Sequence, residues 1–308
     1  MNSAQPATLD LKHYGSEHMN ADFCAALLDS LAEFGFVILR NHGIAATDFA
    51  RAYALAKSLF ALPLEQKRQY ETGSGQRGYI GFGKEKAAGQ QVGDLKEYWH
   101  IGPDIPASVE LDEAYPENVW PQEIPEFKTF FKQLHEQLNQ VAQTLCLALA
   151  EALGVERHYF KEIIAHGNSV QRLIHYPPLR DLDQQGAVRA AAHADINLMT
   201  LLIGATDSGL QLLNKSGTWI EVEHKADEIV VDTGDMMARL TNHYLPATIH
   251  RVVNPPGLDS ARFSIPYFVH PRNSVILECL PRFRERSLDE TAISAGEFLQ
   301  QRLRENGF

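Results

Sequence analysis

The sequence predicts an α+β protein that is mainly β, in which helices support an antiparallel β-barrel or sandwich. The chain has 308 residues, of which 44% are hydrophobic and 22% are charged, so it can bury a sizeable core. Residues 125–154 repeat apolar side chains at a spacing of three and four. Beyond Ser169, short β-branched runs alternate with Gly, Pro, Asp and Asn clusters, the pattern of an antiparallel barrel.

The first third of the chain reads as mixed α and β. Residues 21–34 have the apolar spacing of a helix that ends at Gly35, and residues 36–39 form a short apolar run that favours a strand. Residues 49–60 are again helical in pattern. Residues 73–83 contain five glycines and two aromatics without phosphate-loop spacing, which indicates a loop or a hairpin.

The second part of the chain carries the predicted barrel. Its expected strands lie in the runs 169–176, 198–204, 210–213, 219–222, 228–235, 250–253, 262–269 and 274–279. The helix 125–154 should pack outside this barrel, and residues 294–306 should form a terminal helix. We therefore divide the chain into an N-terminal region, 1–120, and a core region, 121–308, which together form one structural unit.

Charge and cysteine content limit the classes of partner. The net charge is −11 and no basic run is present, so we expect neither nucleic acid nor an anionic membrane surface as partner. Cys24, Cys146 and Cys279 are odd in number and far apart, which is typical of a reducing cytoplasm. The first fifteen residues lack the pattern of a secretory signal, and no apolar run approaches the roughly 20 residues of a membrane span. We expect a soluble, cytoplasmic protein whose oligomeric state is open and for which a monomer is plausible.

One arrangement of side chains predicts a metal site. Among thirteen histidines, His193 alone stands two residues before a carboxylate, Asp195. Side chains two apart on a strand point to the same side, so the imidazole and the carboxylate would project together. His250 opens a later apolar run and would supply a third ligand. Two imidazoles and one carboxylate with open coordination positions suit Fe(II) oxygenase chemistry.

Two other histidines compete for the position of third ligand. His243 lies in a turn-like segment, and His270 ends a predicted strand before Pro271. We interpret both as solvated or capping residues.

The run 262–269 predicts an anion site. Arg262, Ser264, Pro266 and Phe268 share one face of this strand, and a buried arginine requires a partner. A dicarboxylate would supply it, because a guanidinium forks onto a carboxylate and a hydroxyl adds a hydrogen bond. The similar triplet 272–274 follows a His-Pro turn and is discounted.

Blocks along nearly the whole chain resemble the isopenicillin N synthase-like family of 2-oxoglutarate/Fe(II)-dependent oxygenases. The same family has the ordered set found here as His193, Asp195, His250, Arg262 and Ser264. The resemblance lies in residues 35–44, 58–67, 77–83, 94–102, 172–178, 193–202, 209–213, 233–256 and 262–268. It implies a double-stranded β-helix, or jelly-roll, core with a helical N-terminal region. Gly234-Asp235, within one of these blocks, reads as a turn.

The resemblance also implies the cofactors and the reaction. Fe(II) would be held by His193, Asp195 and His250, with 2-oxoglutarate and O₂ as cosubstrates, succinate and CO₂ as products, and ascorbate as an optional supporting reductant. Arg262, Ser264 and Tyr176 would bind 2-oxoglutarate. Plant members have an Asn where this chain has Ile174, so the effect of this residue on cosubstrate binding is left open.

The substrate would be a small-molecule metabolite that undergoes hydroxylation, desaturation or cyclisation. Arg77, Tyr79 and Phe268 fall where family members line the substrate pocket, whereas Trp99, Trp120 and Trp219 are read as packing residues. Two alternatives stay open. One is an Fe(II) oxidase of the same fold that uses no 2-oxoglutarate, and the other is a non-catalytic jelly-roll that serves as a binding module.

Overall fold

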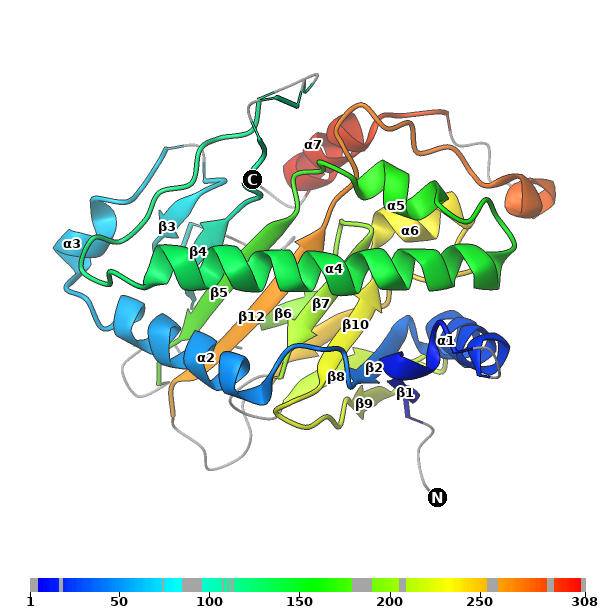
Figure 1. The fold of residues 1–308 in the computed structure, drawn as a ribbon, viewed down its shortest axis with the longest axis horizontal. Coiled ribbons are helices and arrows are strands. Elements are labelled where there is room, and N and C mark those ends of the chain that lie inside the picture. Colours follow the sequence, from blue (N-terminus) through cyan, green and yellow to red (C-terminus); the bar gives the residue numbers. More distant parts are fainter. Residues whose placement is uncertain are drawn as a thin grey trace.

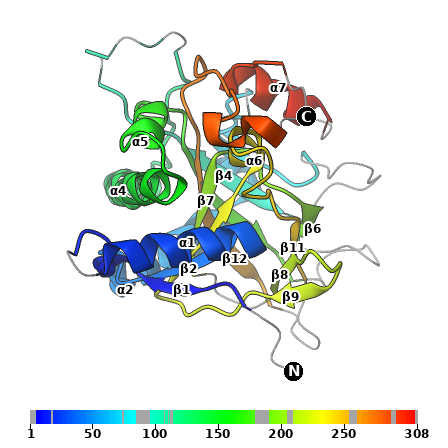
Figure 2. The ribbon, with the colours of Figure 1, turned by 90° about the vertical axis from the view of Figure 1, so that its right-hand side faces the viewer.

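The computed structural model describes residues 5–16, 19–73, 75–84, 96–106, 108–109, 111, 114–178, 190–204, 209–253, 260–286 and 291–305. Within these residues two sheets face each other, and helices cover the outer side of the larger one (Figures 1 and 2). This is the jelly-roll core with helical support that the sequence predicted.

The larger sheet has eight strands in the order β1-β2-β10-β7-β12-β5-β4-β3. Their bounds are β1 Thr8–Asp10, β2 Phe36–Arg40, β3 Gly78–Ile80, β4 Glu97–Ile101, β5 Val170–Tyr176, β7 Met199–Ile203, β10 Ile229–Thr233 and β12 Arg262–Val269. Only β1 and β2 are parallel; the other neighbours pair antiparallel. Strands from both ends of the chain thus belong to one sheet.

The smaller sheet has the order β6-β11-β8-β9, and all its pairings are antiparallel. Its strands are β6 Ala190–His193, β8 Leu210–Leu213, β9 Trp219–Glu221 and β11 His250–Val252. Apolar side chains from the two sheets, such as Ile174 and Val230 from one and Leu212 and Val252 from the other, form one buried cluster. The space between the sheets is therefore the interior of the jelly roll.

The helices are α1 Asn20–Phe34, α2 Ala46–Phe60, α3 Leu64–Arg68, α4 Phe127–Leu153, α5 Tyr159–Ile164, α6 Asp235–Leu240 and α7 Ala295–Glu305, with short 3-10 helices at Leu11–His13 and Pro281–Arg286. α4 crosses the outer face of the larger sheet (Figure 1). Its buried side chains, among them Phe131, Leu138 and Leu145, join a second core cluster with Phe263 and Ile265 of β12. Each fully buried Leu or Phe contributes roughly 1.5–3 kcal/mol, so this face anchors α4 on the sheet.

Glycines end two of these helices as the sequence indicated. α1 stops at Gly35 and α4 at Gly154, and both glycines adopt left-handed φ values of 68° and 66°. A residue without Cβ takes this conformation at low cost and can satisfy the last helical carbonyls. α4 therefore ends within a residue of its predicted bound.

One sequence expectation about strands needs correction. The run 274–279 forms no strand; within it the structure shows a single bridge, from Ile276 to Ser294. The strand expected at His193 is β6, whose sequence, AAAH, has low β-propensity and which pairs with β11. Within the described residues, no helix combines the length and apolarity needed to cross a membrane.

Candidate metal and cosubstrate site

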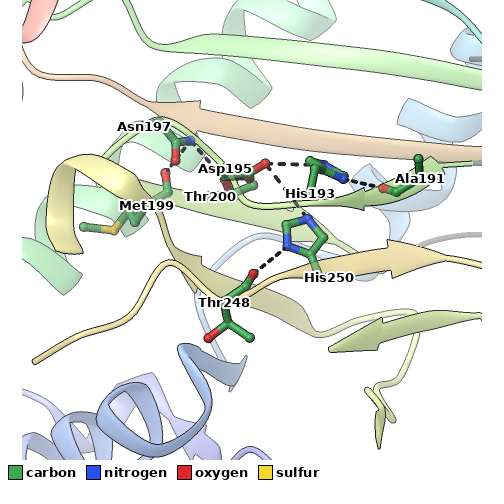
Figure 3. Close-up of polar contacts among 8 residues, drawn as sticks. All are labelled: Ala191, His193, Asp195, Asn197, Met199, Thr200, Thr248 and His250. Atoms are coloured by element: carbon green, nitrogen blue, oxygen red, sulfur yellow. Dashed lines mark hydrogen bonds and ion pairs between the residues drawn. The ribbon is translucent and has the colours of Figure 1, made fainter. Parts of the chain in front are cut away.

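His193, Asp195 and His250 converge at one end of the smaller sheet. His193 is the last residue of β6, Asp195 follows two residues later, and His250 opens β11. In the antiparallel pairing of these strands, His250 lies directly opposite His193. Figure 3 shows the carboxylate of Asp195 facing both imidazoles. The sequence placed these residues on neighbouring strands in the same way.

The three side chains have the spacing of a ligand set. One carboxylate oxygen of Asp195, Oδ1, lies 3.7 Å from His193 Nε2 and 4.0 Å from His250 Nε2. One ligand atom from each residue lies within 4.8 Å of the others, and in the described part of the chain this is the one such cluster of His, Cys, Asp or Glu. Two imidazoles and one carboxylate that leave other positions open are the donor set suited to Fe(II).

Backbone carbonyls orient both imidazoles. His193 Nδ1 lies 2.8 Å from the carbonyl oxygen of Ala191, and His250 Nδ1 lies 3.2 Å from that of Thr248. Because a carbonyl only accepts, each Nδ1 carries the hydrogen, and each Nε2 keeps its lone pair for a metal. Burial, followed by the neighbouring His193, lowers the pKa of His250 to about 4, so the ring is neutral at physiological pH.

A hydrogen-bond chain holds the carboxylate of Asp195. The Thr200 hydroxyl on β7 donates to Asp195 Oδ2, and Asn197 Nδ2 donates in turn to Thr200 Oγ1 over 2.9 Å (Figure 3). The amide N–H of Asp235 donates to the backbone carbonyl of Asp195 over 2.8 Å. Asp195 thus presents Oδ1 toward the histidines while Oδ2 is occupied.

Asp232, on β10, is a second buried carboxyl near this site. It is 5% exposed, and burial, reinforced by the charge of Asp195, raises its pKa well above the ordinary value. This environment favours the protonated form of Asp232.

Arg262 is buried in the interior of the jelly roll. It is 1% exposed, and none of its three side-chain nitrogens has a hydrogen-bond partner among the described residues. Its guanidinium lies 5.6 Å from the ring centroid of Tyr176, the residue that pairs with it across β12 and β5. Ser264, on the same face, is 2% exposed and pairs with Ile174. A buried, unpaired guanidinium is costly, so this end of the interior fits a carboxylate ligand.

A cavity of about 1080 Å³ opens between β3, β4, β5 and α7. Arg77 and Tyr79 line it. Both side chains also have protein partners, since Arg77 donates to Asn168 Oδ1 over 2.5 Å and the Tyr79 hydroxyl donates to Glu97 over 2.6 Å. Phe268 contributes indirectly, because its ring centroid lies 5.0 Å from the guanidinium of Arg172, which does line the cavity.

The two competing histidines lie outside the ligand cluster. His243 is exposed in a turn with a left-handed φ of 58°, as expected. The interpretation of His270 as solvated or capping was wrong. Its side chain faces the cavity, is only partly exposed, and has a pKa lowered by burial to about 4. The alternation that puts residues 262, 264, 266 and 268 on the interior face continues to residue 270, so His270 lies on that face too.

Models of known protein families match two parts of this chain. A family model described as the non-haem dioxygenase in morphine synthesis N-terminal region matches residues 7–123, and one for the 2OG-Fe(II) oxygenase superfamily matches residues 167–271. A 2-oxoglutarate-Fe(II) type oxidoreductase of Metarhizium rileyi is 31% identical over 96% of this chain and 90% of its own. This chain belongs to the 2-oxoglutarate/Fe(II)-dependent oxygenases. It is a dioxygenase that uses Fe(II) and 2-oxoglutarate, so the sequence prediction of enzyme class and cofactors is confirmed.

Solved structures of other proteins support this assignment. A protein of Caulobacter crescentus assigned to the 2OG-Fe(II) oxygenase family is 38% identical, with a TM-score of 0.86 over 97% of this chain and 98% of its own. A full-length Neurospora crassa protein, crystallised with α-ketoglutarate and thymine, is 28% identical, with a TM-score of 0.84 over 97% of this chain and 96% of its own.

Sequence reasoning did not single out the residues that orient Asp195 or one arginine that lines the cavity. Thr200, Asn197 and Arg172 lie within blocks that resemble the family, and Asp232 lies within a predicted strand. For the residues on strands, even spacing with inward residues of the same strand, such as Arg172 with Ile174 and Tyr176, is the signal that could have identified them. Asn197 lies in the loop before β7 and has no such signal.

Proposed function

We propose that this oxygenase holds its iron through His193, Asp195 and His250 and binds the distal carboxylate of 2-oxoglutarate through Arg262 and Ser264. The donor set and the orientation of both imidazoles support the first assignment. The burial of Arg262 supports the second.

The observation that carries this proposal is the buried guanidinium of Arg262 without a partner among the described residues. A desolvated positive charge costs several kcal/mol unless an anion pairs with it. Arg262 and Ser264 point to the same interior face of β12 and can both reach one carboxylate, and Tyr176 lies beside them. Ile174 offers no hydrogen bond, so the ligand's polar contacts would come from the arginine, the serine and the tyrosine.

The residues of the chain then have distinct tasks. His193 and His250 provide neutral Nε2 atoms, and Thr200 keeps Asp195 in a single orientation. The apolar cluster around Ile174, Leu212 and Val252 excludes water from the interior. With O₂, the bound Fe(II) and 2-oxoglutarate supply the oxidising chemistry and yield succinate and CO₂.

We propose a small-molecule metabolite as substrate and the cavity between β3, β4, β5 and α7 as its site. The volume of about 1080 Å³ is at the upper end of ordinary ligand pockets, which run to about 1,000 Å³. The similarity to a structure that holds thymine is consistent with a substrate of this kind. The outcome of oxidation, whether hydroxylation, desaturation or cyclisation, depends on which substrate C–H bond faces the iron.

The first test measures 2-oxoglutarate affinity. Loss of a charge-assisted pair costs about 2–5 kcal/mol, so Arg262→Ala should weaken 2-oxoglutarate binding by roughly 30-fold or more. Arg262→Lys should recover only part of the affinity, because an ammonium cannot fork onto both oxygens. Ser264→Ala should cost about 1 kcal/mol for one hydrogen bond. Calorimetric titration without O₂ and succinate formation with O₂ give both readouts.

Arg251→Ala provides a matched control, because Arg251 lies on β11 beside His250 but donates to Gln211 on the neighbouring β8. It should leave 2-oxoglutarate affinity within about threefold, because successive side chains on a strand face opposite sides and Arg251 therefore faces away from the side of β11 that presents His250. Turnover independent of 2-oxoglutarate and of Arg262 would contradict the proposal and favour the oxidase alternative.

A further inference from the structure

His270 and Asn168 lie opposite each other on the wall of the cavity beside the proposed iron site. Phe268 on β12 pairs with Val170 on β5 in an antiparallel register. Two residues further along each chain, the same register brings His270 opposite Asn168, on the face that carries Phe268 and Val170. Both residues line the cavity. Side chains directly opposite each other have Cβ atoms about 5 Å apart, so one ligand group can reach both.

Backbone contacts hold the two chain segments together at this point. The N–H of His270 donates to Ser169 Oγ over 3.2 Å. A Cβ on Gly167 would clash with the carbonyl oxygen of His270, so glycine is needed for this close approach. The segment around Asn168 therefore packs directly against residue 270, as the register requires.

Arg77 holds the amide of Asn168 in one orientation. Its Nη2 donates to Asn168 Oδ1 over 2.5 Å, and its Nη1 donates to the carbonyl oxygen of Gln76 over 2.8 Å. A guanidinium has only donors, so the atom that faces it must be the amide oxygen. Arg77 is 1% exposed, and its guanidinium fills the space that a Cβ on Gly102 would need. The amide nitrogen of Asn168, which has no hydrogen-bond partner among the described residues, is left to donate to a ligand.

His270 places a neutral imidazole beside this amide. Within the part of the chain that the structure describes, its ring makes no hydrogen bond. Burial lowers its pKa to about 4, so the ring is neutral at physiological pH. A neutral imidazole carries one donor and one acceptor. The pair therefore offers a donor on Asn168 next to an acceptor on His270.

The pair lies close to the segment that carries Asp195. The N–H of Leu198, three residues after Asp195, donates to the carbonyl oxygen of Val269 over 3.0 Å. The charge of Asp195 also acts on the His270 ring, where it partly opposes the effect of burial on the pKa. A substrate group bound by the pair would thus be held beside the proposed iron site.

A cyclic amide, or lactam, has the complementary pattern of hydrogen-bonding groups. In an open-chain secondary amide the C=O and N–H point to opposite sides, because the bond is trans. A small lactam ring holds both groups on the same edge. Neither Asn168 nor the neutral ring of His270 carries a charge, so neither offsets the cost of desolvating an ionised group.

We propose that the substrate carries a lactam whose carbonyl oxygen accepts from Asn168 and whose N–H donates to His270. This inference rests on the proposed function, since it places the substrate in the cavity beside the iron site. The rest of the substrate would occupy the remaining volume of the cavity.

The test compares lactams with lactones of the same ring, in which an oxygen replaces the N–H. The probes are aryl-fused and alkyl-substituted rings of about six to twelve carbons, a size that a cavity of this kind encloses. Binding is measured by calorimetry on the protein loaded with Fe(II) and 2-oxoglutarate without O₂, and turnover by substrate-stimulated succinate formation. The parent should bind at least one lactam more than about tenfold tighter than its lactone, because the lactone leaves the acceptor of His270 unpaired.

Two variants separate the roles of the pair. His270→Phe keeps a flat ring but removes both nitrogens, so it should weaken lactam binding by about tenfold and leave the lactone within about threefold. Asn168→Asp keeps the shape and still accepts from Arg77, but it lacks the amide donor. It should weaken lactam and lactone alike, by about tenfold or more, since both present a carbonyl oxygen.

Gln300→Glu is the matched control for Asn168→Asp. It makes the same change from amide to carboxylate at an exposed residue of α7 that also lines the cavity. Solvent screens the new charge there, so the affinity for both probes should stay within about threefold of the parent. Binding of 2-oxoglutarate to each variant shows that the variant is folded.

The outcomes separate this inference from the proposed function. Lactones that bind as tightly as lactams, a panel in which no lactam binds, or equal losses in Asn168→Asp and Gln300→Glu would overturn the lactam site. The proposed function would stand in each case if 2-oxoglutarate still bound to the parent and depended on Arg262. If His270→Phe abolished 2-oxoglutarate binding while Arg262→Ala did not, the cosubstrate would lie in the cavity, and the proposed function and this inference would fail together.

Discussion

At the scale of single residues, the proposed iron site depends on hydrogen bonds that leave each ligand one orientation. Both histidines donate Nδ1–H to carbonyls two residues earlier in the chain, and Thr200 occupies Oδ2 of Asp195. None of these partners needs to touch the metal. They reduce the conformations that the free site can adopt and so raise its affinity for a metal.

We predict that Thr200→Val weakens metal binding by about 10- to 100-fold, the usual effect of removing a partner of a ligand. Valine preserves the shape of threonine but leaves Oδ2 without its donor, so the carboxylate can rotate. Thr200→Ser should restore most of the affinity. The measurement is calorimetric titration of the metal-free protein with Fe(II) without O₂, and with Mn(II) as a redox-stable probe.

Thr144→Val is the matched control, because Thr144 lies on α4 and donates to a backbone carbonyl on the solvent side. It should not change metal affinity. Equal affinities of the parent and Thr200→Val would show that Asp195 keeps its orientation without this hydrogen bond.

At the scale of elements, the turn between β10 and α6 packs against the segment that carries Asp195. A Cβ on Gly234 would clash with the carbonyl oxygen of Asn197 and would lie 2.8 Å from that of Asp195. The next residue, Asp235, donates its N–H to the same Asp195 carbonyl. The turn that the sequence indicated at Gly234-Asp235 thus positions the ligand segment.

We predict that Gly234→Ala lowers both the free energy of unfolding and the metal affinity, because backbone atoms must move to admit the methyl group. The expected loss of stability is about 1–3 kcal/mol, typical of overpacking. Gly81→Ala serves as control, since its Cβ would meet its nearest neighbours at an ordinary 3.6 Å. Urea unfolding and metal titration test both effects, and an unchanged metal affinity in Gly234→Ala would refute the positional role of the turn.

A buried ion pair connects α3 with the larger sheet. Glu97 on β4 accepts hydrogen bonds from Lys67 over 2.6 Å, from Tyr79 over 2.6 Å and from His175 over 2.8 Å. Burial alone would raise the pKa of Glu97, but these bonds, that from His175 first, lower it below the ordinary 4.5. The ionised form is therefore stabilised more in the folded than in the unfolded protein.

The sign of the pH dependence follows from that lowered pKa. The stabilising contribution of Glu97 is fully present above pH 4.5 and is lost as the pH falls through its lower folded-state pKa. We predict that Glu97→Gln costs about 3–5 kcal/mol at neutral pH, because it leaves Lys67 buried without its counter-charge. Urea unfolding is measured from about pH 7 to about pH 3, a range that spans the titration of the carboxyl. The difference in the free energy of unfolding between parent and variant should shrink below pH 4.5. A difference that is constant with pH would contradict this account.

At the scale of the whole molecule, buried histidines outside the ligand set make the fold sensitive to mild acid. His135 on α4 donates from Nε2 to the carbonyl oxygen of Ser169, and burial lowers its pKa to about 4. His270 has a pKa lowered to about 4, again chiefly by burial. In the unfolded chain both would titrate near the ordinary value of 6.5.

We predict that the free energy of unfolding falls as the pH is lowered from 6.5 to about 4, because in this window the unfolded state binds protons that the folded state excludes. For His135 the full effect is about 3 kcal/mol, at about 1.4 kcal/mol for each unit of pKa. His135→Gln should make stability less dependent on pH in this window. An identical pH profile for parent and variant would show that His135 titrates normally in the folded protein.

The sequence by itself determined the main elements and the order of the site residues. The 3.6-residue spacing of apolar side chains predicted α4, glycines predicted the ends of α1 and α4, and the alternation along residues 262–269 separated the interior face of β12 from its helix-covered face. These features are local, because each depends on neighbours a few positions away in the chain. These residues by themselves leave the chemistry open: His193 with Asp195, the distant His250, and Arg262 with Ser264. The resemblance to a family then supplied that chemistry.

Tertiary structure alone decided what depends on contacts between distant segments. β6 has low strand propensity and persists because it pairs with β11, which also brings His193 opposite His250. The run 274–279 has strand propensity but finds no partner strand in the described residues. Likewise, nothing in the sequence around Arg172 places it between the rings of Tyr98 and Phe268, because strand order puts β4 and β12 on either side of β5. Local sequence sets which conformations a segment favours, whereas pairing and burial, which exist only in the assembled fold, decide which of them persist.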